Sequence, residues 1–164
     1  IYDLTQEDPV AGYDISDGLV LCIGEQEEKL VTVSDTVLTF ADPDGTIAAS
    51  YAYSSEYLRE YDIGGDGFTA LLLNRYQSGS VGRLGTVDPE GEEIASLDIN
   101  REVRSVSAAG KYLAVLYMDE LVVYNRDLQE YAVYEDTDYA REIIMRKDGS
   151  VLLISADSAS LFLP

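Results

Sequence analysis

The stretch Lys111–Glu135, KYLAVLYMDELVVYNRDLQEYAVYE, decides the fold. It holds three short apolar runs, Tyr112–Tyr117, Leu121–Tyr124 and Tyr131–Tyr134, which are separated by short polar breaks. Val, Leu and Tyr runs of this length favour strands, and short polar breaks favour tight connections between antiparallel neighbours. The stretch therefore predicts an antiparallel meander that packs on at least one face.

Similar units occur on either side of this meander. The strands that follow the first turn of each unit begin near Lys29, Phe68, Lys111 and Ser150, so each unit starts at a nearly constant interval after the one before it. A period of about 40 residues with four strands per unit is the signature of a β-propeller blade. The sequence therefore predicts an all-β fold, a β-propeller with about four blades of four antiparallel strands.

The repeat divides one domain, residues 1–164, into a partial blade, three complete blades and a last blade that lacks its outer strand. The units are 1–18, 19–55, 56–100, 101–137 and 138–164. Two turns, Asp42-Pro43-Asp44-Gly45 and Asp88-Pro89-Glu90-Gly91, support this division, because Pro presets φ and Gly tolerates a positive φ. Helical periodicity is not sustained anywhere. A β-sandwich of many short strands is the alternative fold.

The N-terminal residues resemble part of a repeat. Ile1–Leu4 and Pro9–Ile15 read as two strands around an acidic turn, and their pattern matches Val123–Tyr134. We therefore expect the chain to begin partway through a repeat, as an excerpt of a longer protein. An open array exposes apolar faces and strand edges. Three solutions are open: Val10–Ile15 joins the last three strands, two chains form a larger ring as a homodimer, or further blades precede these in a seven- or eight-bladed protein.

The blades resemble those of the WD-repeat and quinoprotein-like propeller superfamily over nearly the whole chain. The hairpins Asp42–Gly45 and Asp88–Gly91 are most similar to those of bacterial extracytoplasmic propellers of uncharacterised function. The chain has no Trp and no His, so the Gly-His and Trp-Asp pairs of WD repeats and the tryptophan docking motifs of quinone dehydrogenases are absent. The resemblance implies a propeller in an extracytoplasmic or cell-surface location, without a quinone cofactor; no targeting signal is visible.

The charge is strongly acidic. Lys and Arg number 11 against 31 Asp and Glu, a net charge of −20, and the range 1–58 holds one basic residue, Lys29. Such a field repels phosphate backbones and anionic lipid. Apolar runs are only a few residues long, too short to span a bilayer. We expect no nucleic-acid partner and no membrane insertion in this segment, with acidity serving solubility.

Residue types exclude several kinds of chemistry. Without His, a Ser-His-Asp or Cys-His nucleophile and the usual zinc sites cannot form. The lone Cys22 is expected to be a small buried hydrophobe. Gly64–Gly67 lies between two predicted strands, so it is no phosphate-binding loop. Asp42–Gly45 and Asp62–Asp66 lack the spacing of a calcium loop. We expect no metal and no cofactor. Two carboxylates suffice for glycoside hydrolysis, but no pair stands out among 31 acids.

One loop departs from the repeat. Arg75–Arg83, RYQSGSVGR, is longer than its counterparts Met118–Glu120 and Asp157–Ala159. It joins the second and third strands of its blade, on the face that carries the blade-to-blade connections, and this is where loops bind ligands. Two arginines and a tyrosine are unusual in an acidic protein. The candidate binding residues are Arg75, Tyr76, Gln77 and Arg83, with no catalytic residue and no metal ligand assigned.

The aromatic content also favours recognition. The chain has 13 Tyr against 3 Phe, and Tyr combines rigid contact area with a polar tip that suits protein or glycan binding. The leading hypothesis is a non-catalytic interaction module that binds a protein or a polysaccharide. A carboxylate-based glycan-active enzyme and a purely structural part of a larger surface protein are the alternatives.

Overall fold

The structure, a computed structural model, describes residues 1, 5, 7–9, 11–15, 18–137 and 139–163. These residues form strands and no helix, so the described part of the chain holds no helix that crosses a membrane. The first sheet consists of β1 (Val20–Gln26), β2 (Lys29–Ser34), β3 (Val37–Ala41) and β4 (Ile47–Ala52). The second consists of β5 (Tyr57–Gly65), β6 (Phe68–Asn74), β7 (Gly82–Val87) and β8 (Glu93–Ile99). The third consists of β9 (Val103–Ala109), β10 (Tyr112–Tyr117), β11 (Leu121–Asn125) and β12 (Glu130–Tyr134), and the last of β13 (Glu142–Met145), β14 (Val151–Ile154) and β15 (Ala159–Phe162).

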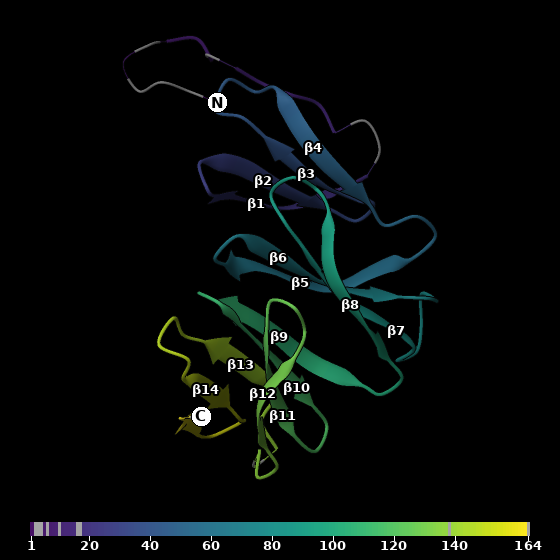
Figure 1. The fold of residues 1–164 in the computed structure, drawn as a ribbon, viewed down its shortest axis with the longest axis vertical. Coiled ribbons are helices and arrows are strands. Elements are labelled where there is room, and N and C mark those ends of the chain that lie inside the picture. Colours follow the sequence, from purple (N-terminus) through teal and green to yellow (C-terminus); the bar gives the residue numbers. More distant parts are fainter. Residues whose placement is uncertain (2–4, 6, 10, 16–17, 138, 164) are drawn as a thin grey trace.

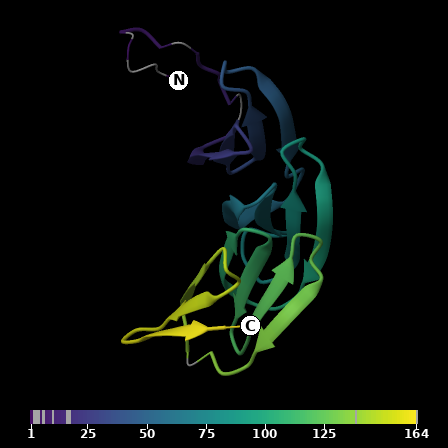
Figure 2. The ribbon, with the colours of Figure 1, turned by 60° about the vertical axis from the view of Figure 1, so that its left-hand side comes forward.

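The sheets are antiparallel meanders, and each pairs its strands in chain order. They follow one another along an arc, with the first sheet at one end and the last at the other (Figures 1 and 2). The two ends of the arc do not meet, so the ring is open. The prediction of an all-β propeller fold built from small antiparallel blades is confirmed, in the form of a partial propeller.

Neighbouring sheets bury each other's faces. Strand β6 is buried along its whole length because alternate residues face different neighbours. Leu71 and Leu73 pack with Val31 of the first sheet, whereas Leu72 packs with Val115 of the third. A strand between two sheets reads as a continuous apolar run, because both of its faces are covered. Burial of each such side chain contributes roughly 1.5–3 kcal/mol.

The inner edges of the third and last blades are held by side chains of the blade before each of them. Strand β5 lies beside β9, and β9 beside β13, without forming a continuous ladder between them. Asp62 in β5 accepts hydrogen bonds from the backbone N–H of Ala108 at 2.8 Å and of Gly64 at 2.7 Å. Ser105 and Ser107 in β9 accept bonds from two backbone N–H groups of β13 in the same way. Side chains thus satisfy donors that would otherwise be orphaned at an inner edge.

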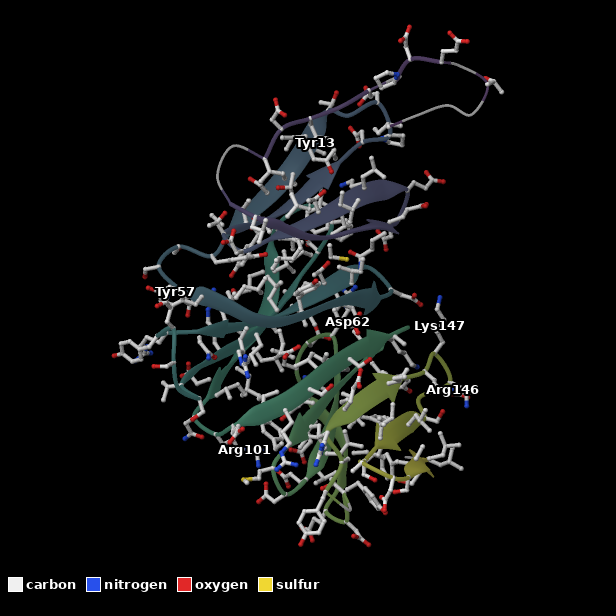
Figure 3. All side chains as sticks on the ribbon, turned by 180° about the vertical axis from the view of Figure 1, so that it is seen from behind. Tyr13, Tyr57, Asp62, Arg101, Arg146 and Lys147 are labelled. Atoms are coloured by element: carbon white, nitrogen blue, oxygen red, sulfur yellow. The ribbon has the colours of Figure 1, made fainter. Side chains whose placement is uncertain are left out.

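The N-terminal segment differs from its prediction. Residues 11–15 form no strand and lie across the outer face of the first sheet, where the Tyr13 hydroxyl is 2.5 Å from the Thr32 hydroxyl. Figure 3 shows Tyr13 at this end. The predicted strand Val10–Ile15 is therefore wrong over residues 11–15, because the strand edge left free in the last sheet lies at the far end of the arc. Residues 2–4 of the predicted strand Ile1–Leu4, and Val10, lie outside the described residues.

Cys22 is free and partly buried, and it packs against the core between the first two sheets. The same core contains Tyr53, which is 1% exposed. Its hydroxyl has no hydrogen-bond partner among the described residues. Burial raises the pKa of the Tyr53 hydroxyl, and the nearby Asp35 carboxylate raises it further.

We predict that Tyr53→Phe leaves the free energy of unfolding unchanged or raises it by up to about 1 kcal/mol, because it removes a buried hydroxyl without a partner. Urea denaturation is the measurement. Tyr117→Phe is the comparison, since the Tyr117 hydroxyl lies 3.4 Å from the Tyr124 hydroxyl. A loss of stability in Tyr53→Phe larger than that in Tyr117→Phe would contradict the prediction.

We predict that Asp62→Ala lowers the free energy of unfolding by roughly 1–3 kcal/mol, because the N–H of buried Ala108 loses its acceptor. The control is Asp66→Ala, further along the same hairpin. The Asp66 side chain is largely exposed, and its interaction with the described residues is a surface ion pair with Lys147 at 3.7 Å; such pairs contribute little. The backbone bond from the Asp66 N–H to the Gly110 carbonyl does not depend on the side chain. Equal stability of the two variants in urea denaturation would show that the bond to Ala108 has no structural role.

Candidate functional site

The two ends of the strands form two different faces of the arc. We call loop face the end that carries the β6–β7 loop (75–81) and the blade-to-blade connections, such as 100–102. We call turn face the opposite end, which carries the tight turns such as 146–150. Figure 3 shows Tyr57 and Arg101 on the loop side, Lys147 on the turn side and Asp62 between them.

A pocket of about 450 Å³ opens on the loop face between the second and third blades. Arg59 of β5 forms one wall, and Glu102 and Val103, at the start of β9, form another. The β6–β7 loop supplies the rest. The complete lining is Arg59, Asn74, Gln77, Ser78, Gly79, Ser80, Glu102 and Val103.

The β6–β7 loop is held in place at its base. Asn74 is 6% exposed and donates a hydrogen bond from Nδ2 to the Gly79 carbonyl at 3.0 Å. The Arg75 N–H donates to the Val81 carbonyl at 2.9 Å. Gly79 has φ 116°, a conformation that side chains disfavour. The loop therefore presents its tip residues on a defined frame.

The four predicted binding residues do not form one cluster. Gln77 lines the pocket, Arg75 is exposed, and Tyr76 is 62% exposed beside it on the loop. Arg83 lies within β7, away from the pocket lining. Their binding roles stay a prediction, and only Gln77 of the four lies in the pocket wall.

Arg83 joins the first two blades through three partners. Its Nε donates to Glu56 at 2.8 Å, its Nη2 to the Tyr51 hydroxyl at 2.7 Å, and its Nη1 to Glu93. Burial opposes the charge on Arg83, but hydrogen bonds to Tyr51 and Glu56 raise its pKa overall. Burial likewise opposes the charge on Glu93, yet hydrogen bonds from Tyr51 and Arg83 hold the pKa of this carboxyl below its usual value.

Sequence reasoning missed the walls that come from other strands. Arg59 and Glu102 lie far apart in sequence and meet because β5 and β9 are neighbours in space. A second pocket of about 330 Å³ lies one junction further along the arc and includes Arg104 and Arg141. An arginine close to the start of β5, β9 and β13 (Arg59, Arg104 and Arg141) is the sequence signal that would have pointed to these walls.

Four carboxyl groups among the described residues have shifted pKa values. Among the described residues, Glu60 is the one carboxyl whose pKa is raised, because burial penalises its charge while Arg59 partly offsets this. The shifted pKa values of Asp44, Glu93 and Asp148 are all lowered. No group of three or more Asp, Glu or Cys side chains in the described ranges is arranged to hold a metal ion. The pocket chemistry is that of hydrogen bonding by guanidinium, amide, hydroxyl and carboxylate groups.

Comparison with solved structures supports the architecture. The computationally designed protein Ika4 matches with a TM-score of 0.65 at 9% identity, over 96% of this chain and 98% of that chain. Hsv2 from Kluyveromyces lactis matches with a TM-score of 0.63 at 14% identity, over 92% of this chain and 52% of that one. The WD40 repeats of RRP9 match with a TM-score of 0.57 at 10% identity, over 79% and 44%. The chain thus spans about half of these two proteins.

No family model matches the sequence, and no curated protein matches it either. The structural neighbours confirm the β-propeller repeat fold that the sequence predicts. At these identities they show the fold alone.

We predict that Arg83→Gln lowers the free energy of unfolding by about 1–3 kcal/mol at pH 7, because Glu56 and Glu93 keep their partly buried carboxylates without a cation. Arg75→Gln, on the exposed loop, should change it by less than about 0.5 kcal/mol. Denaturation in urea compares the two variants with the unmodified chain.

The Arg83→Gln effect should depend on pH. The lowered folded pKa of Glu93 means that its contribution is present above the unfolded pKa and disappears as the pH falls through the folded value. The difference between the unmodified chain and Arg83→Gln should therefore shrink below about pH 4.5. A difference that stays constant down to pH 3 would be inconsistent with an ionic contribution from Glu93.

Proposed function

We propose that this chain is a non-catalytic interaction module that binds a segment of a protein at the loop face, in the pocket beside the β6–β7 loop. The observation that carries the proposal is the pocket itself. Its walls come from two blades and a loop, and they offer hydrogen-bond donors and acceptors.

The polar groups of the pocket suit a peptide backbone with polar side chains. Gln77 supplies an amide, Ser78 and Ser80 supply hydroxyls, and Arg59 and Glu102 supply charges of opposite sign. Each of these side chains is at least partly exposed and available to a partner. A few well-placed polar groups in a concave site give orientation and specificity.

The distribution of basic residues also favours a binding site on the loop face. Five of the eleven basic residues, Arg59, Arg75, Arg101, Arg104 and Arg141, lie toward the loop face. Arg101 is already engaged, since it pairs with Glu120 and lies 3.5 Å above the centre of the Tyr117 ring. Arg59, Arg75 and Arg141 form no ion pair with any described residue. These three cations can attract a carboxylate-bearing segment.

Exposed tyrosines border the pocket and add contact area. Tyr76 is 62% exposed on the loop, and Tyr57, at the start of β5, is 46% exposed. Tyr57 is paired in register with Asn74, which lines the pocket. Tyr side chains provide large, rigid anchors at protein interfaces. A partner that fills the pocket also reaches these rings.

The test is selection of linear peptides from a phage-displayed library on the unmodified chain, followed by affinity measurement with synthetic peptides. We predict that Arg59→Glu weakens the selected peptides at least tenfold, about 1.4 kcal/mol, because charge reversal places an unpaired carboxylate in the pocket wall. The control is Arg126→Glu, on the turn face, which should leave affinity unchanged. Arg126 is exposed, like Arg59.

Two outcomes would overturn the proposal. One is a set of peptides whose affinity is insensitive to Arg59→Glu, which would place binding elsewhere. The other is failure to select any peptide while a glycan array gives binding that Arg59→Glu abolishes, which would replace a protein ligand by a polysaccharide.

A further inference from the structure

Exposed aliphatic side chains gather at the two ends of the arc. Of eleven Ile, Leu and Val side chains that are exposed among the described residues, nine lie on the first or last sheet or on the segments next to them. At the first end these are Ile1, Leu19, Val20, Leu21, Ile23 and Ile47, and at the last end Ile144, Leu161 and Leu163. The inner sheets bury the equivalent faces against a neighbour.

The last sheet also lacks a strand. Three sheets have four strands each, whereas β13, β14 and β15 form a sheet of three in the described part of the chain. Strand β15 therefore presents a row of unpaired backbone groups at its outer edge, beside the exposed Leu161. A free, apolar edge of this kind is a template for another strand.

The chain contains a segment with the residue pattern of an outer strand. Each complete blade has an Ala in its fourth strand, followed two positions later by Tyr or Leu that packs against the core. The three pairs are Ala49 and Tyr51, Ala95 and Leu97, and Ala132 and Tyr134. Residues 11–15, Ala-Gly-Tyr-Asp-Ile, repeat this pattern with Ala11 and Tyr13, and they closely match Ala95–Ile99, Ala-Ser-Leu-Asp-Ile.

The strand pairing of the complete blades fixes the register that this segment would adopt. The Ala of each fourth strand lies opposite Phe40, Thr86 or Val123 in the third strand. These three residues are equivalent to Leu161 of β15, because all four are paired with equivalent positions of the second strand. The second-strand partners of Phe40, Thr86, Val123 and Leu161 are Val31, Ala70, Ala114 and Leu152, respectively. The equivalence places Ala11 opposite Leu161, Gly12 opposite Ser160 and Tyr13 opposite Ala159.

We propose that residues 11–15 of one chain form the fourth strand of the last blade of a second copy, antiparallel to β15 and in this register. The exchange is reciprocal, so that two chains close into one ring through two identical junctions. At each junction the outer face of the first sheet of one copy covers the outer face of the last sheet of the other.

The segment belongs to the second copy because its own β15 is out of reach in this fold. Figures 1 and 2 place the N-terminal segment and the last sheet at opposite ends of the arc. Residues 11–15 instead lie on the first sheet of their own chain. Closure within one chain would require the four blades to bend into a ring that the packed junctions between them do not form.

The present position of the segment is loosely packed. Between it and the first sheet remains a mostly apolar groove of about 440 Å³, lined by residues such as Tyr13, Ile15, Ile23 and Leu30. Among the described residues, the backbone hydrogen bonds of residues 11–15 are confined to those between Ala11 and Ile1. Protein cores are close-packed, whereas this contact leaves a groove between the segment and the sheet. Residues 11–15 therefore lose little packing when they leave the first sheet to pair as a strand elsewhere.

Charge favours pairing between unlike ends. The range 1–58 carries twelve carboxylates and one lysine, whereas the range 138–164 carries four carboxylates and three basic residues. Contact between two first sheets would bring like charges together, which the junction of a first sheet with a last sheet avoids. Two copies also supply about the length of Hsv2, of which one copy covers 52%.

The register is tested by a disulfide. In a Cys22→Ala background, the pair Gly12→Cys and Ser160→Cys should form, after mild oxidation, a covalent dimer of two chains, because directly opposite residues lie within disulfide reach. The matched control keeps Gly12→Cys but places the second cysteine at Ser96 instead of Ser160. Ser96 lies in β8, where the fourth strand of the blade is already present, so this control should give no covalent dimer. A disulfide within one chain, no disulfide, or equal crosslinking of the control would each overturn the proposal.

The ring is tested by light scattering on the unmodified chain, which should show twice 18.0 kDa. Leu161→Glu should return the mass to that of one chain. Val133→Glu is the control on a central blade, where the exposed fraction of the side chain is 40% against 49% for Leu161, and it should leave the mass doubled. Two results would contradict the proposal. One is a single-chain mass for the unmodified protein, and the other is a mass above that of two chains, as expected for an open filament.

Discussion

A single blade of this fold can neither bury its own apolar faces nor pair the backbone groups at its inner edge, and this constraint governs the rest of the structure. Each small sheet has two apolar faces and an inner strand whose edge lacks a ladder partner. The next blade covers the face, and side chains such as Asp62 and Ser107 accept the N–H groups of the neighbouring inner strand. Packing and backbone satisfaction therefore act at the same junctions, and the arc is a chain of nearest-neighbour contacts.

The candidate site follows from this arrangement. Inner strands β5 and β9 lie side by side, so Arg59 near the start of β5 and Glu102 just before β9 meet at a common opening. The β6–β7 loop closes it because Asn74, at the end of a buried strand, holds the loop carbonyl of Gly79. Rigid strand ends position the charged walls, and the extended loop supplies adaptable amide and hydroxyl groups.

The periodicity of the sequence was enough to predict the fold, whereas the roles of individual polar residues could not be predicted from the sequence. Runs of Val, Leu and Tyr that recur at a nearly constant interval encode blades, because local strand patterns repeat in order along the chain. Arg83 belonged to a predicted binding loop, yet its partners Tyr51, Glu56 and Glu93 lie on three other segments. Asp62 was weighed as an oxygen ligand for calcium, and it instead accepts hydrogen bonds from the backbone N–H of Gly64 in its own strand and of Ala108 in the neighbouring blade. Such contacts depend on three-dimensional neighbours that no short window of sequence contains.

The proposed closure also decides where the binding pockets would lie. A ring formed by joining unlike ends has its two-fold axis along the central channel, so both loop faces point in the same direction. The two pockets beside the β6–β7 loops would then open on one surface. Pairing of like ends has no such requirement and can turn the pockets in different directions. A partner that carries two copies of the recognised segment would bind such a ring with avidity that a single arc cannot provide, since the second contact becomes intramolecular. Ring closure and recognition at the loop face are thus separate properties that reinforce each other.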